Sequence, residues 1–179
     1  MDFAELQNTV NSIKEKFPPV HLWNPDLCEG VEMNIDREGN WFYQGSIIGR
    51  EKLKILFSRI LKFENGNYYL VTPVEKILVN VDIAPYMIID YEVDSSIEKI
   101  ILKTNLDLSI PLDKEHIMEL KKIGDELIPF VQVRDNIEGF VSRSVYYSLI
   151  EIAISQGSSS SNKLTLKSFD HVFNLGEMR

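Results

Sequence analysis

Residues 69–76 read Tyr-Leu-Val-Thr-Pro-Val-Glu-Lys, an apolar run that stops at Pro73 and is followed by two opposite charges. Proline cannot donate to a strand ladder and restricts the residue before it, so we expect a strand to end at Thr72, at a sheet edge or a cleft. Glu75 and Lys76 are adjacent and would face opposite sides of a strand, so each needs its own partner. Either they form separate surface salt bridges, or one of them lies in an interface between two halves of the molecule.

The segments around this stretch follow strand and helix patterns. Residues 68–72, 76–81 and 87–93 read as strands, and residues 31–43 read as a hairpin that turns at Glu38-Gly39-Asn40. Residues 3–17 repeat apolar side chains at helical spacing, so we expect an N-terminal helix that ends at Pro18-Pro19. A further helix is predicted over residues 48–61, whose apolar face comprises Ile48, Leu53, Leu56, Phe57, Ile60 and Leu61.

The second half of the chain repeats this order of elements. Residues 99–104, 106–110 and 127–133 read as strands, residues 116–123 as a helix and residues 143–154 as a final helix. The helix over residues 116–123 would place Ile117, Leu120 and Ile123 inward. The segment that follows the final helix is rich in serine, and the tail after it is either a docked strand or disordered.

Two apolar positions of the first half, Ile48 and Val71, have counterparts at Leu112 and Val131, roughly 60 to 64 positions later. This spacing favours a duplicated strand-strand-helix-strand unit, and the predicted fold class is α+β with two small packed halves. We expect an N-terminal helix at residues 1–19, a first half at 20–95, a second half with its C-terminal helix at 96–154, and a linker and tail at 155–179.

Composition narrows the classes of partner. The 179 residues include 19 Lys and Arg against 27 Asp and Glu, which gives a formal net charge of −8. Such a field repels phosphate backbones and anionic lipid surfaces, so we expect no extended nucleic acid and no membrane as partners, although a local basic pocket for a small anion is compatible with it. The acidic N-terminal segment differs from a signal peptide, and Cys28 is the only cysteine, so we expect a cytosolic protein.

The usual anchors of catalysis are missing from the sequence. No nucleophile elbow, phosphate-binding loop or dinucleotide fingerprint is present, and the histidines, His21, His116 and His171, lie in three separate segments. Cys28 and His21 could form a thiol–imidazole pair, but a lone cysteine without an orienting third residue is more often a small buried hydrophobe. We therefore expect no metal, no cofactor and no catalytic residues.

Aromatic and basic residues of the first half form one candidate binding set. On a strand, Trp41 and Tyr43 face the side opposite to Phe42, so one face packs in the core and the other could stack a base or a sugar. Arg50, at the entrance to the predicted helix, would supply a guanidinium fork for an anion. The alternative is that Arg50 is an ordinary surface cation.

A second candidate set lies in the other half. Asn105 has amide groups suited to base or ribose recognition, yet an asparagine at this place is equally explained by a turn. Arg134 ends a predicted strand and either reaches solvent or meets a carboxylate such as Glu138. Arg143 opens the final helix near Tyr147, an arrangement that suits an anion or a stacked ring but is also common as a simple helix-to-sheet contact.

An ordered series of residues resembles a bacterial family catalogued as domain of unknown function twelve eighty-five. The series spans roughly residues 18–154 and consists of Trp23-x-Pro25-x-x-Cys28, Trp41-Phe42-Tyr43-x-Gly45-x-x-Ile48-x-Arg50, Leu56-Phe57-Ser58, Leu70-Val71-Thr72-Pro73-Val74-Glu75-Lys76, Asp82-x-Ala84-Pro85, Thr104-Asn105, Val131-x-Val133-Arg134 and Arg143-x-x-Tyr146-Tyr147. The chain departs from the family pattern at Glu38-Gly39, where Asp-Gly is usual, and at Gly30, which is displaced from the cysteine.

The resemblance implies a duplicated two-domain architecture, a second domain loosely similar to pleckstrin-homology barrels, and a ligand cleft between the halves. It also implies a nucleotide-like ligand and a signalling role. The leading hypothesis is therefore a ligand-binding or sensing module that holds a small anion. The alternatives are a protein-interaction scaffold that binds a polypeptide at a sheet edge, and a metal-dependent phosphoesterase that acts through Glu75.

Overall fold

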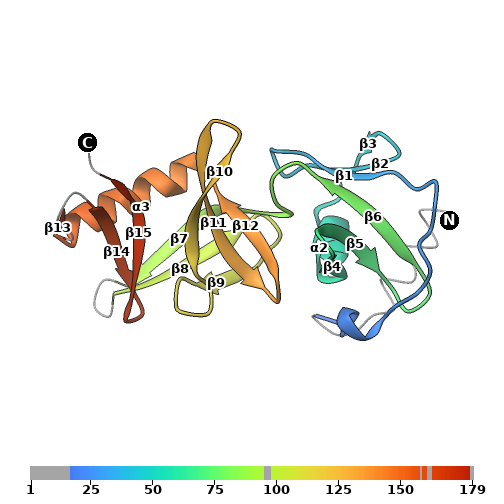
Figure 1. The fold of residues 1–179 in the computed structure, drawn as a ribbon, viewed down its shortest axis with the longest axis horizontal. Coiled ribbons are helices and arrows are strands. Elements are labelled where there is room, and N and C mark those ends of the chain that lie inside the picture. The colour runs from blue at the N-terminus through green and yellow to red at the C-terminus, as the bar shows by residue number, and fades with distance from the viewer. Residues whose placement is uncertain (1–16, 95–97, 158, 161–162, 178–179) are drawn as a thin grey trace. The chain divides into compact units, whose positions relative to one another are not determined.

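The computed structural model describes residues 17–94, 98–157, 159–160 and 163–177. The chain divides into two compact units, Met1–Pro85 and Tyr86–Arg179 (Figure 1). The helix predicted near the N-terminus falls largely on residues 1–16, outside the described residues.

Unit 1 is a six-stranded sheet with one α-helix in the connection between its third and fourth strands. The strand order is β3-β2-β1-β6-β5-β4, in which β1 and β6 run parallel and all other neighbours are antiparallel. Its elements are η1 (Val20–Leu22), β1 (Met33–Ile35), β2 (Trp41–Tyr43), β3 (Ser46–Ile47), α2 (Glu51–Arg59), β4 (Leu61–Glu64), β5 (Asn67–Val71) and β6 (Lys76–Val81).

The predicted helix of unit 1 is confirmed as α2. Its apolar face buries Leu53 and Phe57 against the sheet, where the Phe57 and Trp41 rings stack with centroids 6.3 Å apart. The helix is shorter than predicted because Ile60 already leaves helical geometry and Leu61 begins β4. Apolar burial of this kind contributes about 25 cal/mol per Å² and makes the helix a lid on the core of unit 1.

Unit 2 contains a second six-stranded sheet, in the order β10-β11-β12-β7-β8-β9, with β7 and β12 parallel. A three-stranded sheet in the order β13-β14-β15 follows the helix α3 in the chain. The elements are β7 (Tyr86–Asp94), β8 (Lys99–Thr104), β9 (Ser109–Pro111), β10 (Met118–Ile123), β11 (Glu126–Arg134), β12 (Ile137–Val141), α3 (Arg143–Ser155), β13 (Ser159–Ser160), β14 (Lys163–Ser168) and β15 (His171–Glu177).

The two six-stranded sheets have the same topology. Counted from the first strand of each unit, both follow the order 3-2-1-6-5-4, and in both the first strand is parallel to the sixth. Equivalent hydrogen bonds recur just beyond the parallel pair: the amide of Asp82 donates to the carbonyl of Ile35, and that of Ser142 donates to Ile88, each at 3.0 Å. The predicted duplication is therefore confirmed at the level of strand order.

The predicted equivalence of helices is wrong. The segment expected as a helix near residue 120 is strand β10, paired along its whole length with β11 from Met118↔Val131 to Ile123↔Glu126. The apolar residues of this segment are compatible with both the helical and the strand period. Pairing with β11 makes the segment a strand. Met118, not Ile117 or Ile123, is the buried residue, since those two isoleucines are 43% and 40% exposed.

Two further boundaries differ from the sequence-based expectation. The last strand expected in the first half is β7, which pairs with β8 and β12 of unit 2. The boundary between the units therefore lies between Pro85 and Tyr86 in the chain, and not near residue 95. The strand expected at residues 106–110 begins later, at Ser109, because the Thr104 hydroxyl accepts the amides of Leu106 and Leu108 in a turn.

The final helix is confirmed as α3, and the tail after the serine-rich segment is a docked sheet. Strand β14 packs along α3, and the Tyr146 hydroxyl donates to the carbonyl of Leu175 in β15. The side chain of Gln156 pairs with the backbone of Lys167 through both of its amide atoms, at 3.0 and 2.9 Å. Unit 2 thus continues beyond residue 154. Its likeness to a pleckstrin-homology barrel stays a prediction.

Candidate functional site

A cavity of about 470 Å³ lies in unit 1, where β2, β3 and the start of α2 meet. It brings together two residues that the sequence analysis placed in one candidate set, Tyr43 and Arg50. Among the described residues, its lining consists of Tyr43, Ser46, Ile47, Ile48, Gly49, Arg50 and Leu53. Its size falls within the range of small-molecule pockets, about 300–1,000 Å³.

A tight turn places Tyr43 at the cavity. Gln44 and Gly45 have φ angles of 47° and 73°, which is the pattern of a two-residue type I′ hairpin loop between β2 and β3. The chain then returns alongside β2, where the amide of Ile48 donates to the carbonyl of Trp41 at 2.7 Å. Ile48 and Leu53 are buried, so the floor of the cavity is apolar and anchored in the core.

Arg50 occupies the N-cap position of α2 and is exposed. Within the described part of the chain no carboxylate pairs with its guanidinium. The neighbouring Glu51 is held by Lys54 at 2.6 Å, so that carboxylate does not neutralise Arg50. No side chain caps the first turn of α2, and the positive end of its dipole adds to the charge of Arg50. The mouth of the cavity is therefore a local positive site on an acidic protein.

Trp41 does not line this cavity, contrary to the sequence-based expectation. Its side chain is fully buried against Phe57 in the core of unit 1. Its Nε1 has no hydrogen-bond partner among the described residues. Trp41 is thus a core residue, and Tyr43, two positions along the same strand face, is the aromatic residue that reaches the cavity.

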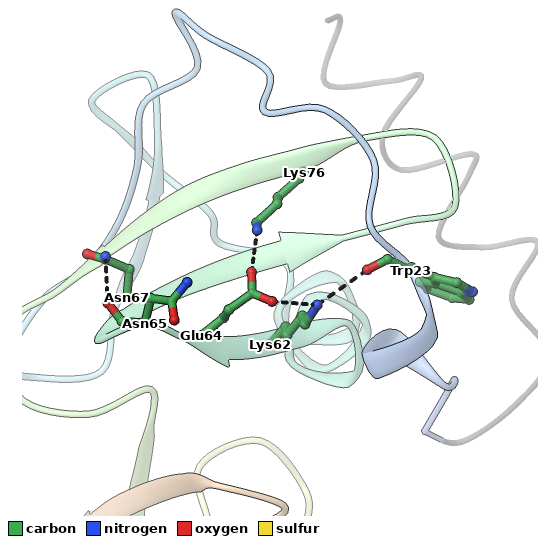
Figure 2. A network of polar contacts seen from close by, with 6 residues as sticks. All are labelled: Trp23, Lys62, Glu64, Asn65, Asn67 and Lys76. Atoms are coloured by element: carbon green, nitrogen blue, oxygen red, sulfur yellow. Dashed lines mark hydrogen bonds and ion pairs between the residues drawn. The ribbon is translucent and has the colours of Figure 1, made fainter.

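Lys76 belongs to a separate polar network on strands β4 and β6 (Figure 2). Its Nζ lies 2.5 Å from Oε2 of Glu64, while Nζ of Lys62 lies 3.0 Å from Oε1 of the same carboxylate. Lys62 also donates to the carbonyl of Trp23 at 3.3 Å, and Lys76 lies over the ring of Tyr69. Hydrogen bonds from Lys76, and then from Lys62, hold the pKa of Glu64 below its ordinary value.

The rest of the opening motif forms a hairpin turn. The amide of Thr72 donates to the carbonyl of Glu75 at 2.8 Å, and the Thr72 hydroxyl accepts the amide of Glu75 at 3.1 Å. Thr72 is buried, so its hydroxyl is engaged inside the turn and does not face a ligand. The backbone of Lys76 also binds the segment around Cys28, because the Lys76 carbonyl accepts a hydrogen bond from the Cys28 amide at 2.7 Å. The motif therefore has a structural role in unit 1.

In unit 2 the nominated residues are held by local contacts. The Asn105 side-chain oxygen accepts the amide of Met87 at 3.0 Å, and the Asn105 amide donates back to Met87 at 2.8 Å, so Asn105 fastens a turn to β7. Arg134 donates from Nε to the Tyr86 hydroxyl at 3.2 Å and pairs with Asp135 at 2.9 Å. Of the two alternatives for Arg134, solvent or a carboxylate, the structure shows a carboxylate. The partner is the adjacent Asp135 and not Glu138.

The remaining nominated residues lie near the start of α3. Glu138, which had been considered as a partner for Arg134, instead binds Lys121 at 2.5 Å. Arg143 pairs with Glu126 at 3.1 Å, and its side chain is 82% exposed. Tyr147 lies one turn later and is 63% exposed. The ligand cleft between the halves, which the family resemblance implies, stays a prediction.

Sequence reasoning missed five members of the cavity, namely Ser46, Ile47, Ile48, Gly49 and Leu53. A partial signal for them was present in Gly45, because glycine readily adopts the positive φ that a two-residue hairpin loop requires. That hairpin returns the chain beside Tyr43 before the helix begins. Across the described residues, no group of three His, Cys, Asp or Glu side chains could hold a metal ion. No helix among them is long and apolar enough to cross a membrane.

Two family descriptions match this chain along most of its length. The N-terminal domain of DUF1285, a domain of unknown function, matches residues 18–84, and the C-terminal domain of DUF1285 matches residues 85–175. The division between these matches lies within one residue of the division between units 1 and 2. No curated protein matches the chain.

Two solved structures are similar to this one. A DUF1285 family protein from Silicibacter pomeroyi is 34% identical, with a TM-score of 0.80, over 94% of this chain and 93% of that one. A DUF1285 family protein from Shewanella baltica is 26% identical, with a TM-score of 0.57, over 69% of this chain and 94% of that one. At 94% of this chain, the first likeness extends over most of both units.

Proposed function

The chain belongs to the DUF1285 family, as its ordered signature residues indicated, and because that family is described as of unknown function we propose a role from the unit 1 cavity. The protein is a ligand-binding module that holds a small organic anion between Tyr43, Arg50 and the apolar floor. In a sensing role, the protein would report whether the ligand is bound in the cavity or absent from it.

The observation that carries this proposal is the exposed guanidinium of Arg50 at the mouth of a concave, partly apolar site. Arg134 and Arg143 are held by Asp135 and Glu126, whereas Arg50 pairs with no carboxylate in the described ranges. A hydrogen bond to a charged group contributes roughly 1.5–3 kcal/mol. Arg134 and Arg143 already form such bonds with carboxylates of the protein, whereas the guanidinium of Arg50 can form them with a bound anion.

A thermal-shift screen tests the proposal. Nucleotides, phosphate esters and carboxylic acids are added separately to the full chain at constant ionic strength. A ligand that binds only the native state stabilises it by about 2.7 kcal/mol at a hundredfold excess over its dissociation constant, so a true ligand raises the unfolding midpoint. We expect Arg50→Ala to abolish the shift.

Arg59→Ala is the matched control, because Arg59 lies at the far end of the same helix and its replacement removes the same charge. This variant should keep the ligand-induced shift. A shift that survives in Arg50→Ala, or that both variants lose equally, would place the anion elsewhere. If no compound raises the midpoint, the ligand-binding role fails.

A protein-interaction role is the second candidate, and exposed apolar side chains of unit 2 favour it. Leu127 and Tyr147 are 65% and 63% exposed, and the ion pair of Glu126 and Arg143 ties their elements together. These two side chains offer apolar area to a partner chain. Light scattering across a concentration series would support this role if the mass rises and Leu127→Lys prevents the rise.

A further inference from the structure

We propose that the ligand of the unit 1 cavity is a monocarboxylic acid with a flat apolar body, in preference to a nucleotide. This inference rests on the ligand-binding function proposed above and narrows it to one chemical class. The lining residues divide into a single cationic group, a ring and an aliphatic floor, and each part restricts the ligand independently.

Charge balance sets the number of acidic groups. Among the described lining residues, Arg50 is the only one with a permanent charge, and its planar fork matches one carboxylate through two parallel N–H···O bonds. The lysine of the next turn, Lys54, is already engaged by Glu51. A polyphosphate would bring several negative charges to one guanidinium on a chain with net charge −8, and most of them would lack a partner.

The surface of the cavity sets the character of the ligand body. Ile48 and Leu53 are 6% and 4% exposed and form an apolar floor, while Ile47 and the Tyr43 ring add apolar area at the rim. A flat ring or a conjugated chain can lie against these groups, because aromatic faces favour stacked or edge-on contacts. Water is released from both surfaces when the ligand binds.

A nucleobase would leave its polar edges without matching side chains. Among the described lining residues other than Arg50, only Ser46 and Tyr43 carry a polar side-chain group, a single hydroxyl each, and Tyr43 already has an interaction partner. The nearest amide side chain, Gln44, donates to the carbonyl of Gly30 at 3.1 Å. A site that leaves buried polar groups of its ligand unpaired discriminates against that ligand. The cavity therefore suits an apolar ring better than a base.

Gly49 provides a steric probe of the same cavity. A Cβ added at this position would have nothing within 4 Å, and the backbone is outside the left-handed region that favours glycine. A larger side chain there can occupy the open space without disturbing the core. Gly49→Leu should therefore block the ligand and leave the unliganded midpoint unchanged.

Isothermal titration calorimetry on the full chain tests the class directly. The probes are phenylacetate, indole-3-acetate and cinnamate, compared with AMP and ATP at equal ionic strength, and with 2-phenylethanol as an uncharged analogue of phenylacetate. We expect at least one of the three acids to bind at least tenfold more tightly than either nucleotide and than the alcohol. Arg50→Ala and Gly49→Leu should each weaken that acid at least tenfold, and Arg59→Ala should not.

The outcomes separate this inference from the function on which it rests. If AMP or ATP binds most tightly and requires Arg50, the anion-binding function holds and the carboxylic-acid class is wrong. If no probe binds with dependence on Arg50, both are wrong. An acid that binds equally well to Gly49→Leu would also overturn the inference, because it would lie outside the cavity.

Discussion

Nζ of Lys76 lies 2.5 Å from Oε2 of Glu64, across a sheet in which Lys62 holds the other carboxylate oxygen at 3.0 Å. Two cations on one carboxylate explain why the pKa of Glu64 is lowered. The same arrangement fastens the segment around Trp23 to β4 through Lys62 (Figure 2). Lys76 was nominated as a ligand-binding residue; the structure places it in this network, and a binding role for it stays a prediction.

The network predicts an acid-sensitive contribution to stability. Because the pKa of Glu64 is lower in the folded protein than its ordinary value of 4.5, ionised Glu64 favours the folded state. This contribution is fully present above pH 4.5 and is lost as the pH falls through the folded-state pKa. Urea unfolding should therefore show Glu64→Gln to be less stable than wild type at pH 7 and equal to it at the acid end of the titration.

Glu29→Gln is the control for this experiment, since Glu29 is an exposed carboxylate in the same unit. Its stability difference from wild type at pH 7 should be small, because the side chain is exposed. A difference between Glu64→Gln and wild type that persists unchanged into acid would show that the contribution comes from packing instead of ionisation.

Arg134 should behave as a structural residue. Its side chain is only 10% exposed and bonds to the buried Tyr86 and to Asp135, so Arg134→Ala removes hydrogen bonds to a charged group. We expect a loss of roughly 1.5–3 kcal/mol in the free energy of unfolding of unit 2. Chemical denaturation measures it, and Arg143→Ala, which removes an exposed pair, should cost much less. Equal effects of the two substitutions would contradict the contrast.

Gly139 should not tolerate a side chain. A Cβ at this position would lie 2.9 Å from the Tyr86 Cβ, 3.0 Å from the Tyr86 carbonyl oxygen and 3.1 Å from Cγ2 of Val133. Gly139 is also the direct partner of Tyr86 in the parallel pair of β12 and β7, so the backbone cannot withdraw without loss of the ladder. We expect Gly139→Ala to destabilise unit 2 by about 1–3 kcal/mol. Gly49→Ala, which enters open space, is the comparison and should cost little.

Nucleic acid should not bind with measurable affinity. The formal net charge of −8 repels a phosphate backbone, and a single unpaired guanidinium at a cavity does not offset it. Titration with duplex and single-stranded oligonucleotides at low salt should show no association that weakens steeply with added salt. Sub-micromolar, salt-sensitive binding would contradict this prediction.

Local sequence patterns were sufficient to predict the helices and strands whose apolar residues repeat with one clear spacing. The helices α2 and α3 and the hairpin of β1 and β2 follow from apolar spacing and from the turn at Glu38-Gly39. The repeated apolar positions indicated the duplication, which the common strand order of the two sheets confirms. Each of these features depends on residues close together in the chain, or on a pattern that occurs twice.

Long-range pairing decided what local patterns left ambiguous. The segment of β10 has side chains compatible with a helix, and its six paired positions on β11 make it a strand. Likewise, the sequence allows β7 to be the last strand of unit 1 or the first strand of unit 2. Its parallel pairing with β12 assigns it to unit 2. These choices depend on hydrogen bonds to partners whose distance in the chain no local period encodes.

The candidate site divides in the same way. The sequence by itself determined that Tyr43 and Arg50 carry suitable chemistry, that the chain is acidic, and that a proline turn follows Thr72. Only the tertiary structure decided that Trp41 is buried in the core and that Lys76 and Arg134 are engaged by partners, while Arg50 stands at a cavity. The physical reason is that a side chain is available for a ligand only when the fold has not already satisfied its charge and hydrogen bonds, and its partners come from distant parts of the chain.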